Sequence, residues 1–135
     1  MNRRTFLMTT AAAALLPTLA SAAQNYTPGL VDSLLAEGKT VFIDFKTDWC
    51  TTCAAQERVI GGLKSDNPAY AENITFVNVD WDNYANDELS IRLRIPRRST
   101  LVVLKGEEEL GRIVAGTSRS QIQALMDTAL TAATA

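Results

Sequence analysis

The sequence predicts a single α/β domain in which a mixed sheet carries helices on both faces. Short apolar runs typical of buried strands alternate with segments whose apolar residues follow helical spacing. Near the C-terminus two strand-like runs flank a tight turn, and a helical segment follows them, which predicts a hairpin and a closing helix. The chain has 135 residues, of which 47% are hydrophobic and 21% charged, so it suits one folded domain rather than a disordered segment.

The first half of the domain is expected to place one buried strand between two helices. Residues 24–27 form a polar lead, and residues 30–35 have helical spacing that ends at Gly38. Residues 41–45 are apolar except for one acid and predict a buried strand. The second helix is expected over residues 51–63, and its glycine pair, Gly61-Gly62, marks a point where it kinks or ends early.

The second half is expected to contribute three strands and two helices. The strands are predicted at residues 74–79, 100–104 and 110–114. A short helix is predicted at residues 88–93, and the last helix begins after Ser118, with Gln121 completing a capping box. Loops are expected at residues 67–68 and 80–86, and the alanine-rich tail after Leu130 is expected to fray. The expected order is therefore α-β-α-β-α-β-β-α, in which a strand, helix and strand in sequence imply a right-handed parallel crossover.

The N-terminal residues have the pattern of a targeting segment. Arg3 and Arg4 supply a positive start, residues 6–19 are apolar or small, and Ala-Ser-Ala predicts cleavage after Ala22. Residues 1–22 are therefore interpreted as a signal peptide. The segment is short and rich in alanine for a membrane span of ~20 residues, although an uncleaved anchor helix is the alternative. The arginine pair resembles a twin-arginine signal, with the general secretory route as the other possibility. The domain at residues 24–135 is thus expected in the periplasm.

The charge of the mature chain argues against several classes of function. Loss of Arg3 and Arg4 leaves 11 basic and 15 acidic residues, a net charge of −4, so no nucleic-acid partner is expected. The sequence contains no histidine, which removes the most frequent general base and metal ligand. We expect neither a metal nor a cofactor.

The only two cysteines, Cys50 and Cys53, stand three residues apart where the predicted strand gives way to a helix. A helix N-terminus stabilises negative charge, so Cys50 at the N-cap is expected to form a thiolate that attacks a disulfide. Cys53, one turn further in, would then resolve the mixed disulfide. A structural disulfide and a metal site are the alternatives. So small a loop constrains the unfolded chain little, and zinc usually needs four ligands.

Residues 41–53 resemble the active-site segment of the thioredoxin family. Trp49 directly precedes the first cysteine, and Asp44 stands six residues before it. The strand at residues 100–105, with the turn and Gly116 that follow, resembles the family's C-terminal hairpin, so the similarity covers roughly residues 30–130. The strongest resemblance is to the periplasmic C-terminal domain of transmembrane thiol:disulfide reductases, where a glutamate also follows four residues after the second cysteine, here Glu57.

The resemblance implies a thioredoxin-like fold and roles for three further side chains. Asp44 would lie beneath Cys53 with a raised pKa and accept its proton, unless it is a strand-end acid pointing to water. Glu57 would couple to the titration of the thiols, with a solvated helix acid as the alternative. Trp49 would cover the disulfide as an apolar platform, with plain core packing as the alternative.

One position departs from the family pattern. Thioredoxin-like proteins carry a cis-proline before the third strand, facing the cysteines, and the alignment places Ser99 there. Pro96 stands three residues too early and takes that place only if the loop is remodelled. A cis bond before serine costs about 2.5–4 kcal/mol, so a trans peptide is expected. The Ser99 hydroxyl would then lie near Cys50.

Four arginines precede that position and form a predicted positive patch beside the site. They are Arg92, Arg94, Arg97 and Arg98. The patch could lower the pKa of Cys50 or recognise an acidic partner. The alternative is a solvated surface whose arginines pair with nearby acids, namely Asp80, Asp82, Asp87 and Glu88.

These observations predict an exported thiol:disulfide oxidoreductase that reduces protein disulfides through Cys50 and Cys53. Strong oxidants of this class often have histidine between the cysteines, whereas Thr51 and Thr52 stand here, which favours a reductase. The expected partners are disulfide-bonded exported proteins and a membrane electron donor, and the chain is expected to be a monomer. The alternative is a thioredoxin-like binding or chaperone module, for a partner or a metal, with little redox turnover.

Overall fold

The computed structural model describes residues 22–135 of the chain. Almost all of the expected signal peptide therefore lies outside the described residues, and its cleavage stays a prediction. Within the described part, no helix combines the length and the apolar character that crossing a bilayer requires.

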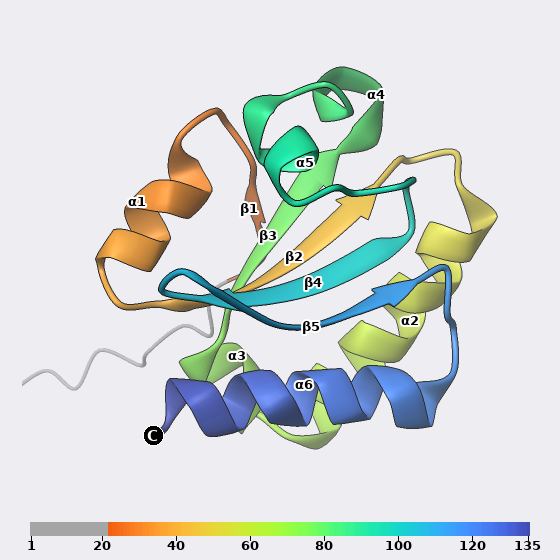
Figure 1. The fold of residues 1–135 in the computed structure, drawn as a ribbon. Coiled ribbons are helices and arrows are strands. Elements are labelled where there is room, and N and C mark those ends of the chain that lie inside the picture. Colours follow the sequence, from red (N-terminus) through yellow and green to blue (C-terminus); the bar gives the residue numbers. More distant parts are fainter. Residues whose placement is uncertain (1–21) are drawn as a thin grey trace, which may run out of the picture.

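The fold is a five-stranded mixed sheet with the strand order β1-β3-β2-β4-β5 (Figure 1). The strands are β1 (Gln24–Asn25), β2 (Thr40–Lys46), β3 (Thr75–Asp80), β4 (Thr100–Lys105) and β5 (Glu108–Val114). The helices are α1 (Leu30–Ala36), α2 (Thr51–Asp66), α3 (Ala69–Asn73), α4 (Trp81–Tyr84), α5 (Glu88–Arg92) and α6 (Arg119–Ala133). β1, β3 and β2 are mutually parallel, whereas β4 runs antiparallel to both β2 and β5. The predicted α/β class and C-terminal hairpin are confirmed.

Helices cover both faces of the sheet, as predicted, with α2, α3 and α6 on one side and α1, α4 and α5 on the other (Figure 1). Successive side chains of a strand point to opposite faces, so β2 serves both layers. Ile43 and Phe45 belong to the apolar cluster that includes residues of α1 and α5. Phe42 belongs to the second cluster, with residues of α2, α3 and α6. The central strand is therefore buried on both sides.

Two short elements lie in segments predicted as polar lead or loop, and a third lies where no element was predicted. The lead at residues 24–27 contains β1, in which Gln24 pairs with Val77 of β3 through the backbone. The loop predicted at residues 80–86 contains α4, whereas the loop at residues 67–68 is confirmed and is followed by α3, which was not predicted. The buried Tyr70 anchors α3, and Asp80 caps α4 by accepting a hydrogen bond from the backbone of Asp82 at 3.0 Å. Elements this short depend on neighbours and caps rather than on periodicity.

Two helices extend further than predicted. α2 continues through Gly61-Gly62 to Asp66, because Ile60 and Leu63, which stand on either side of the glycine pair, are buried in the core. α6 continues past Leu130 to Ala133, since Ala129 is fully buried and Ala133 packs against the same apolar cluster. In both cases tertiary packing outweighs the weak local preference.

Candidate active site

The two cysteines lie where the chain leaves β2 and enters α2. Cys50 is the N-cap of α2, and its Sγ accepts a hydrogen bond from the backbone N–H of Cys53 at 3.1 Å. This is the position that the sequence predicted for the attacking sulfur. Both cysteines are free thiols, with exposed fractions of 5% for Cys50 and 1% for Cys53. The outer thiol therefore lies just below the surface, and the inner one is enclosed.

A serine hydroxyl contacts both sulfurs. Ser99 Oγ lies 3.2 Å from Cys50 Sγ and 3.1 Å from Cys53 Sγ. The structure thus places Ser99, rather than the exposed Pro96, opposite the cysteines, and the peptide bond before Ser99 is trans. The backbone of Ser99 has φ 64, a left-handed conformation that is costly for a residue with a side chain. Its N–H donates to Phe45 O at 2.7 Å, which ties this loop to the end of β2.

The surroundings separate the acidities of the two thiols. Burial raises the pKa of Cys50, but hydrogen bonds from the Cys53 thiol, the Ser99 hydroxyl, the Cys53 backbone and the Arg98 side chain outweigh it and lower that pKa to about 6. Burial raises the pKa of Cys53, and its hydrogen bond to Cys50 raises that pKa further. One sulfur is therefore suited to exist as a thiolate at neutral pH, and the other holds the proton.

Asp44 lies inside the protein on the α2 side of β2. Its exposed fraction is 4%, and its Oδ1 has no hydrogen-bond partner. The alternative that it points to water is therefore wrong. Burial, followed by the charge of Glu57, raises the pKa of Asp44 to about 7, while the charge of Lys46 acts in the opposite direction. A carboxyl with this pKa can exchange a proton near neutral pH.

Glu57 is connected to the buried acid through a lysine and a shared pocket. Its carboxylate forms an ion pair with Lys46, so the alternative of a merely solvated helix acid does not describe it. Glu57 and Asp44 both line a pocket of about 190 Å³ beside α2. The structure therefore brings these two acids together, while the coupling of Glu57 to the thiols stays a prediction.

Trp49 stands at the rim of the site rather than in the core. Its side chain is 61% exposed, so the alternative of core packing is wrong. The indole Nε1 donates to Asp82 Oδ2 at 2.9 Å, and the Arg98 guanidinium lies 4.3 Å from the centre of the ring. The predicted role of Trp49 as a cover for the disulfide stays a prediction, and its ring is available to a partner.

Sequence reasoning missed Gln56, which positions the serine loop. This fully buried side chain donates from Nε2 to the carbonyl oxygens of Ser99 and Gly116, at 2.9 Å each. Gln56 stands one turn after Cys53 on the buried face of α2, where an apolar residue is usual. A polar residue on that face was the signal that could have revealed it, because a buried amide needs partners.

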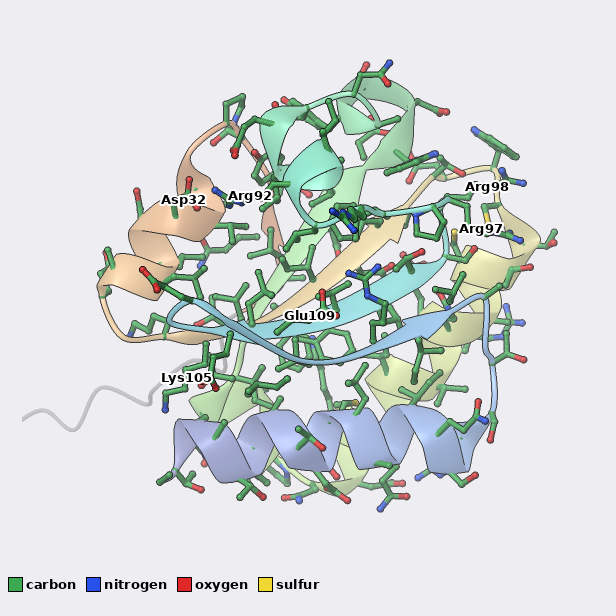
Figure 2. All side chains as sticks on the ribbon, viewed as in Figure 1. Asp32, Arg92, Arg97, Arg98, Lys105 and Glu109 are labelled. Carbon is green, nitrogen blue, oxygen red and sulfur yellow. The ribbon has the colours of Figure 1, made fainter. Side chains whose placement is uncertain are left out.

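The four arginines do not form one patch. Arg92 pairs with Asp32 of α1 and with Glu88 of α5, which confirms for this residue the alternative of local pairing. Arg97 and Arg98 lie close together beside the start of α2, on the other side of the view from the Arg92–Asp32 pair (Figure 2). Arg92 therefore leaves the predicted patch, whereas Arg97 and Arg98 lie where the patch was expected (Figure 2).

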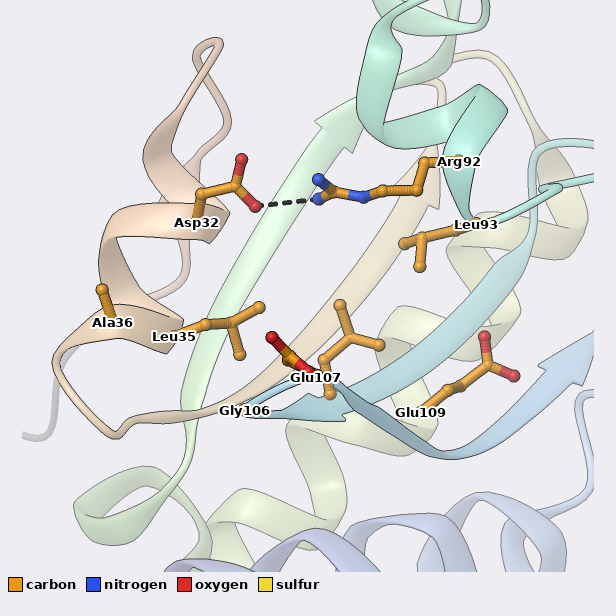
Figure 3. Close-up of a pocket in the computed structure, with 9 residues that line it drawn as sticks. Asp32, Leu35, Ala36, Arg92, Leu93, Gly106, Glu107 and Glu109 are labelled. Carbon is orange, nitrogen blue, oxygen red and sulfur yellow. Dashed lines mark hydrogen bonds and ion pairs between the residues drawn. The ribbon is translucent and has the colours of Figure 1, made fainter.

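A separate pocket of about 580 Å³ lies away from the cysteines, between α1, α5 and the hairpin of β4 and β5. Arg92 reaches across it to Asp32, and Leu35 and Leu93 lie nearby (Figure 3). None of the predicted catalytic or supporting residues lines this pocket. Within residues 22–135, no three acidic, cysteine or histidine side chains gather as they would around a metal ion.

Sequence comparisons connect this site to known proteins. The thioredoxin family model matches residues 15–128. The chain is 31% identical over 90 residues to thioredoxin H2-1 of Oryza sativa subsp. japonica, covering 67% of this chain and 60% of the rice protein. It is 32% identical over 85 residues to thiol:disulfide interchange protein DsbD 2 of Pseudomonas aeruginosa, covering 60% of this chain and 14% of that protein. The chain therefore spans less than two thirds of both relatives.

Solved structures give the same result for the fold. Trxlp of Edwardsiella tarda superposes with a TM-score of 0.64 and 28% identity, covering 78% of this chain and 96% of that one. The thioredoxin of Malassezia sympodialis superposes with a TM-score of 0.68 and 24% identity, covering 81% and 91% respectively. The fold is thioredoxin-like, and with its Cys-Thr-Thr-Cys segment at the head of α2 this chain belongs to the thioredoxin family.

Proposed function

We propose that this protein is an exported thiol–disulfide oxidoreductase that reduces disulfide bonds in other exported proteins. The observation that carries the proposal is the environment of Cys50, whose sulfur accepts a backbone hydrogen bond at a helix N-terminus and contacts the Ser99 hydroxyl. Membership of the thioredoxin family and the similarity to a thiol:disulfide interchange protein support the same chemistry.

The reaction proceeds in two exchanges that conserve electrons and protons. The Cys50 thiolate attacks one sulfur of the client disulfide, forms a mixed disulfide and releases the other client sulfur as a thiolate. Cys53 then loses its proton and attacks the Cys50 sulfur, which closes the Cys50–Cys53 disulfide and releases the second client thiolate. Two electrons pass to the client, so a dithiol donor must reduce the pair again before the next cycle.

Asp44 is proposed as the acceptor of the Cys53 proton. The inner thiol has a raised pKa and needs a base, and the chain contains no histidine. Asp44 is buried on the α2 side of β2, and its raised pKa makes it a stronger base than an exposed carboxylate. The pocket that Asp44 shares with Glu57 offers a route by which the proton reaches solvent.

Export and the direction of electron flow rest on sequence features. Residues 1–22 have the pattern of a signal peptide, which supports a periplasmic location after cleavage. The Thr51-Thr52 pair supports a reductase, because it lacks the histidine that strengthens oxidants of this class. A reductase outside the cytoplasm needs a supply of electrons, which supports a membrane-bound dithiol donor. N-terminal sequencing of the exported protein tests cleavage, since a mature chain that retains Arg3 and Arg4 contradicts it.

The test of the activity is insulin reduction with dithiothreitol as donor, together with the reduction potential of the cysteine pair. We expect turnover in the native chain, no turnover in Cys50→Ser, and accumulated mixed disulfide in Cys53→Ser. The reduction potential should be more negative than about −200 mV, since reductases of this fold lie near −270 mV and strong oxidants near −120 mV. A potential near the oxidant value would reverse the proposed direction.

A binding or chaperone module is the second candidate, and the trans Ser99 at the usual cis-proline position favours it. Alkylation of Cys50 as a function of pH separates the two candidates. The oxidoreductase is expected to show a pKa of about 6 for Cys50. The binding module would be supported if the protein shows no turnover and the pKa of Cys50 is about 8.5, the value of a free cysteine.

A further inference from the structure

Two adjacent arginines lie beside the start of α2, and one of them contacts the exposed tryptophan that precedes Cys50 (Figure 2). The Arg98 guanidinium lies 4.3 Å from the centre of the Trp49 ring, and this ring is 61% exposed. Arg97 precedes it in the same loop and donates from Nε to the Arg98 carbonyl oxygen at 3.0 Å. The loop continues directly into Ser99, which contacts both sulfurs. Trp49, Arg97 and Arg98 are called the docking rim below.

The four acids that the sequence offered as partners of the arginines contact other groups, although one of them, Asp82, lies at the rim itself through Trp49. Asp82 accepts the hydrogen bond of Trp49, and Asp80 binds Asn83 and caps α4. Asp87 accepts from Tyr26 at 2.6 Å and caps α5. Glu88 pairs with Arg92. The ion pairs among residues 22–135 involve Lys46, Arg92, Arg112 and Arg119 as cations, and neither Arg97 nor Arg98 takes part in one.

This positive rim contrasts with the rest of the domain. Residues 22–135 contain 11 basic and 15 acidic residues, so the molecule repels anions in general. A surface that places two unpaired guanidinium groups at its reactive cysteine reverses that repulsion locally. Guanidinium groups bind carboxylates through paired hydrogen bonds, and an exposed indole offers an apolar contact beside them.

We propose that the docking rim selects protein clients whose reactive disulfide is flanked by acidic residues. This inference rests on the proposed function and names its substrate class. The carboxylates of the client pair with Arg97 and Arg98 while its disulfide meets Cys50, and the Trp49 ring packs against the client backbone. The acidic remainder of the domain then discourages anionic chains from binding anywhere but at the site.

The test uses peptides that share one intramolecular disulfide and differ only in two flanking residues, Glu, Gln or Lys. The second-order rate of reduction by the reduced protein is measured at low salt and in 1 M NaCl. We expect the Glu peptide to react about tenfold faster than the Gln peptide at low salt, at the lower end of electrostatic steering, and the Lys peptide to react slowest. The preference should nearly vanish at high salt, where the Debye length is about 3 Å.

Variants assign the preference to the rim. Arg97→Gln is the variant with the simpler interpretation, because Arg97 has no hydrogen bond to either cysteine. In the double variant Arg97→Gln with Arg98→Gln, the reduction rates of the Glu and Gln peptides should differ by no more than about twofold. Arg98 also affects Cys50, so each rate is divided by the thiolate fraction from alkylation, and Arg98→Lys should retain part of the preference. Lys39→Gln is the matched control. It removes one charge from an exposed residue before β2, at the opposite end of this strand from the cysteines, and should leave the preference intact.

Two results would overturn the inference: equal rates for the Glu and Gln peptides with the native protein, or a preference that survives loss of both arginines. Failure of the proposed function is distinguishable from these. If no peptide is reduced, calorimetric binding of the same peptides to Cys50→Ser decides the matter. Tighter binding of the Glu peptide than of the Gln peptide would support the docking rim as a binding surface, and equal binding of the two peptides would contradict it.

Discussion

The two sides of strand β2 differ in what they bury. Towards α1 and α5, Ile43 and Phe45 pack among aliphatic and aromatic side chains, and both are fully buried. Towards α2 the strand presents Asp44, which is 4% exposed and has an oxygen without a hydrogen-bond partner. The same side of the sheet carries α2, with the two cysteines and Gln56.

This difference shows how one strand serves stability and chemistry together. Apolar burial contributes free energy of folding at about 25 cal/mol per Å², whereas an unpaired buried carboxyl costs free energy unless it is protonated. Adjacent residues of β2 therefore act in opposite directions on stability. The apolar clusters on both sides of the sheet therefore supply the stability that offsets the strained and polar groups beside α2.

The largest effect is expected from Ile43→Ala on the apolar side. Truncation of a fully buried isoleucine removes apolar contacts and leaves a cavity, so the free energy of unfolding should fall by about 2–5 kcal/mol. Chemical denaturation measures this loss, and Ile43→Val should lose only about 0.5–1.5 kcal/mol. The pKa of Cys50 should stay at about 6 in both variants. A displaced pKa would show that the two sides of β2 are not independent.

On the reactive side, Asp44→Asn is expected to slow the resolution of the mixed disulfide. Loss of the proton acceptor should lower the rate of mixed-disulfide resolution about a hundredfold, the lower limit for a general base, while attack by Cys50 continues. Rapid-mixing assays of a client mixed disulfide separate the two steps. An unchanged resolution rate would remove Asp44 from the mechanism.

The same variant tests the cost of the buried acid through pH. The pKa of Asp44 is about 7 in the folded protein and 3.8 in the reference state, so the folded protein binds more protons between these values. Stability therefore falls as pH rises from about 4 to 7, by up to about 4 kcal/mol in total from this group. The difference in unfolding free energy between Asp44→Asn and the native chain should rise across that window. A constant difference would contradict the raised pKa.

The smallest effect is expected from Ser99→Ala. A hydrogen bond to a charged sulfur contributes about 1.5 kcal/mol, so its loss should raise the pKa of Cys50 from about 6 to about 7. Alkylation rates at pH 6 should fall several-fold and converge with the native rates above pH 8. Ser33→Ala, at an exposed position of α1, serves as the control and should leave the titration unchanged. An unaltered titration of Cys50 in Ser99→Ala would show that the pKa of this thiol is lowered without the Ser99 hydroxyl, through groups such as the backbone N–H of Cys53.

The sequence by itself determined the α/β class, the long helices and central strands, and the placement of Cys50 and Cys53 at a strand-to-helix junction. Apolar periodicity and the cysteine spacing are local signals that suffice for such features. It also identified Asp44, because an acid within an apolar run is conspicuous, and Ser99, because the family alignment places it.

Only the tertiary structure decided which polar groups meet. Gln56 reaches Ser99 and Gly116 across 43 and 60 residues of chain, and Arg98 reaches Trp49 across a similar separation. It also decided that α2 continues through its glycines, that β1 joins the sheet, and that Arg92 is neutralised by Asp32 while Arg97 and Arg98 are not. The physical reason is the same in each case. Hydrogen bonds, ion pairs and burial depend on distances between residues remote in sequence, which the packed sheet and helices set.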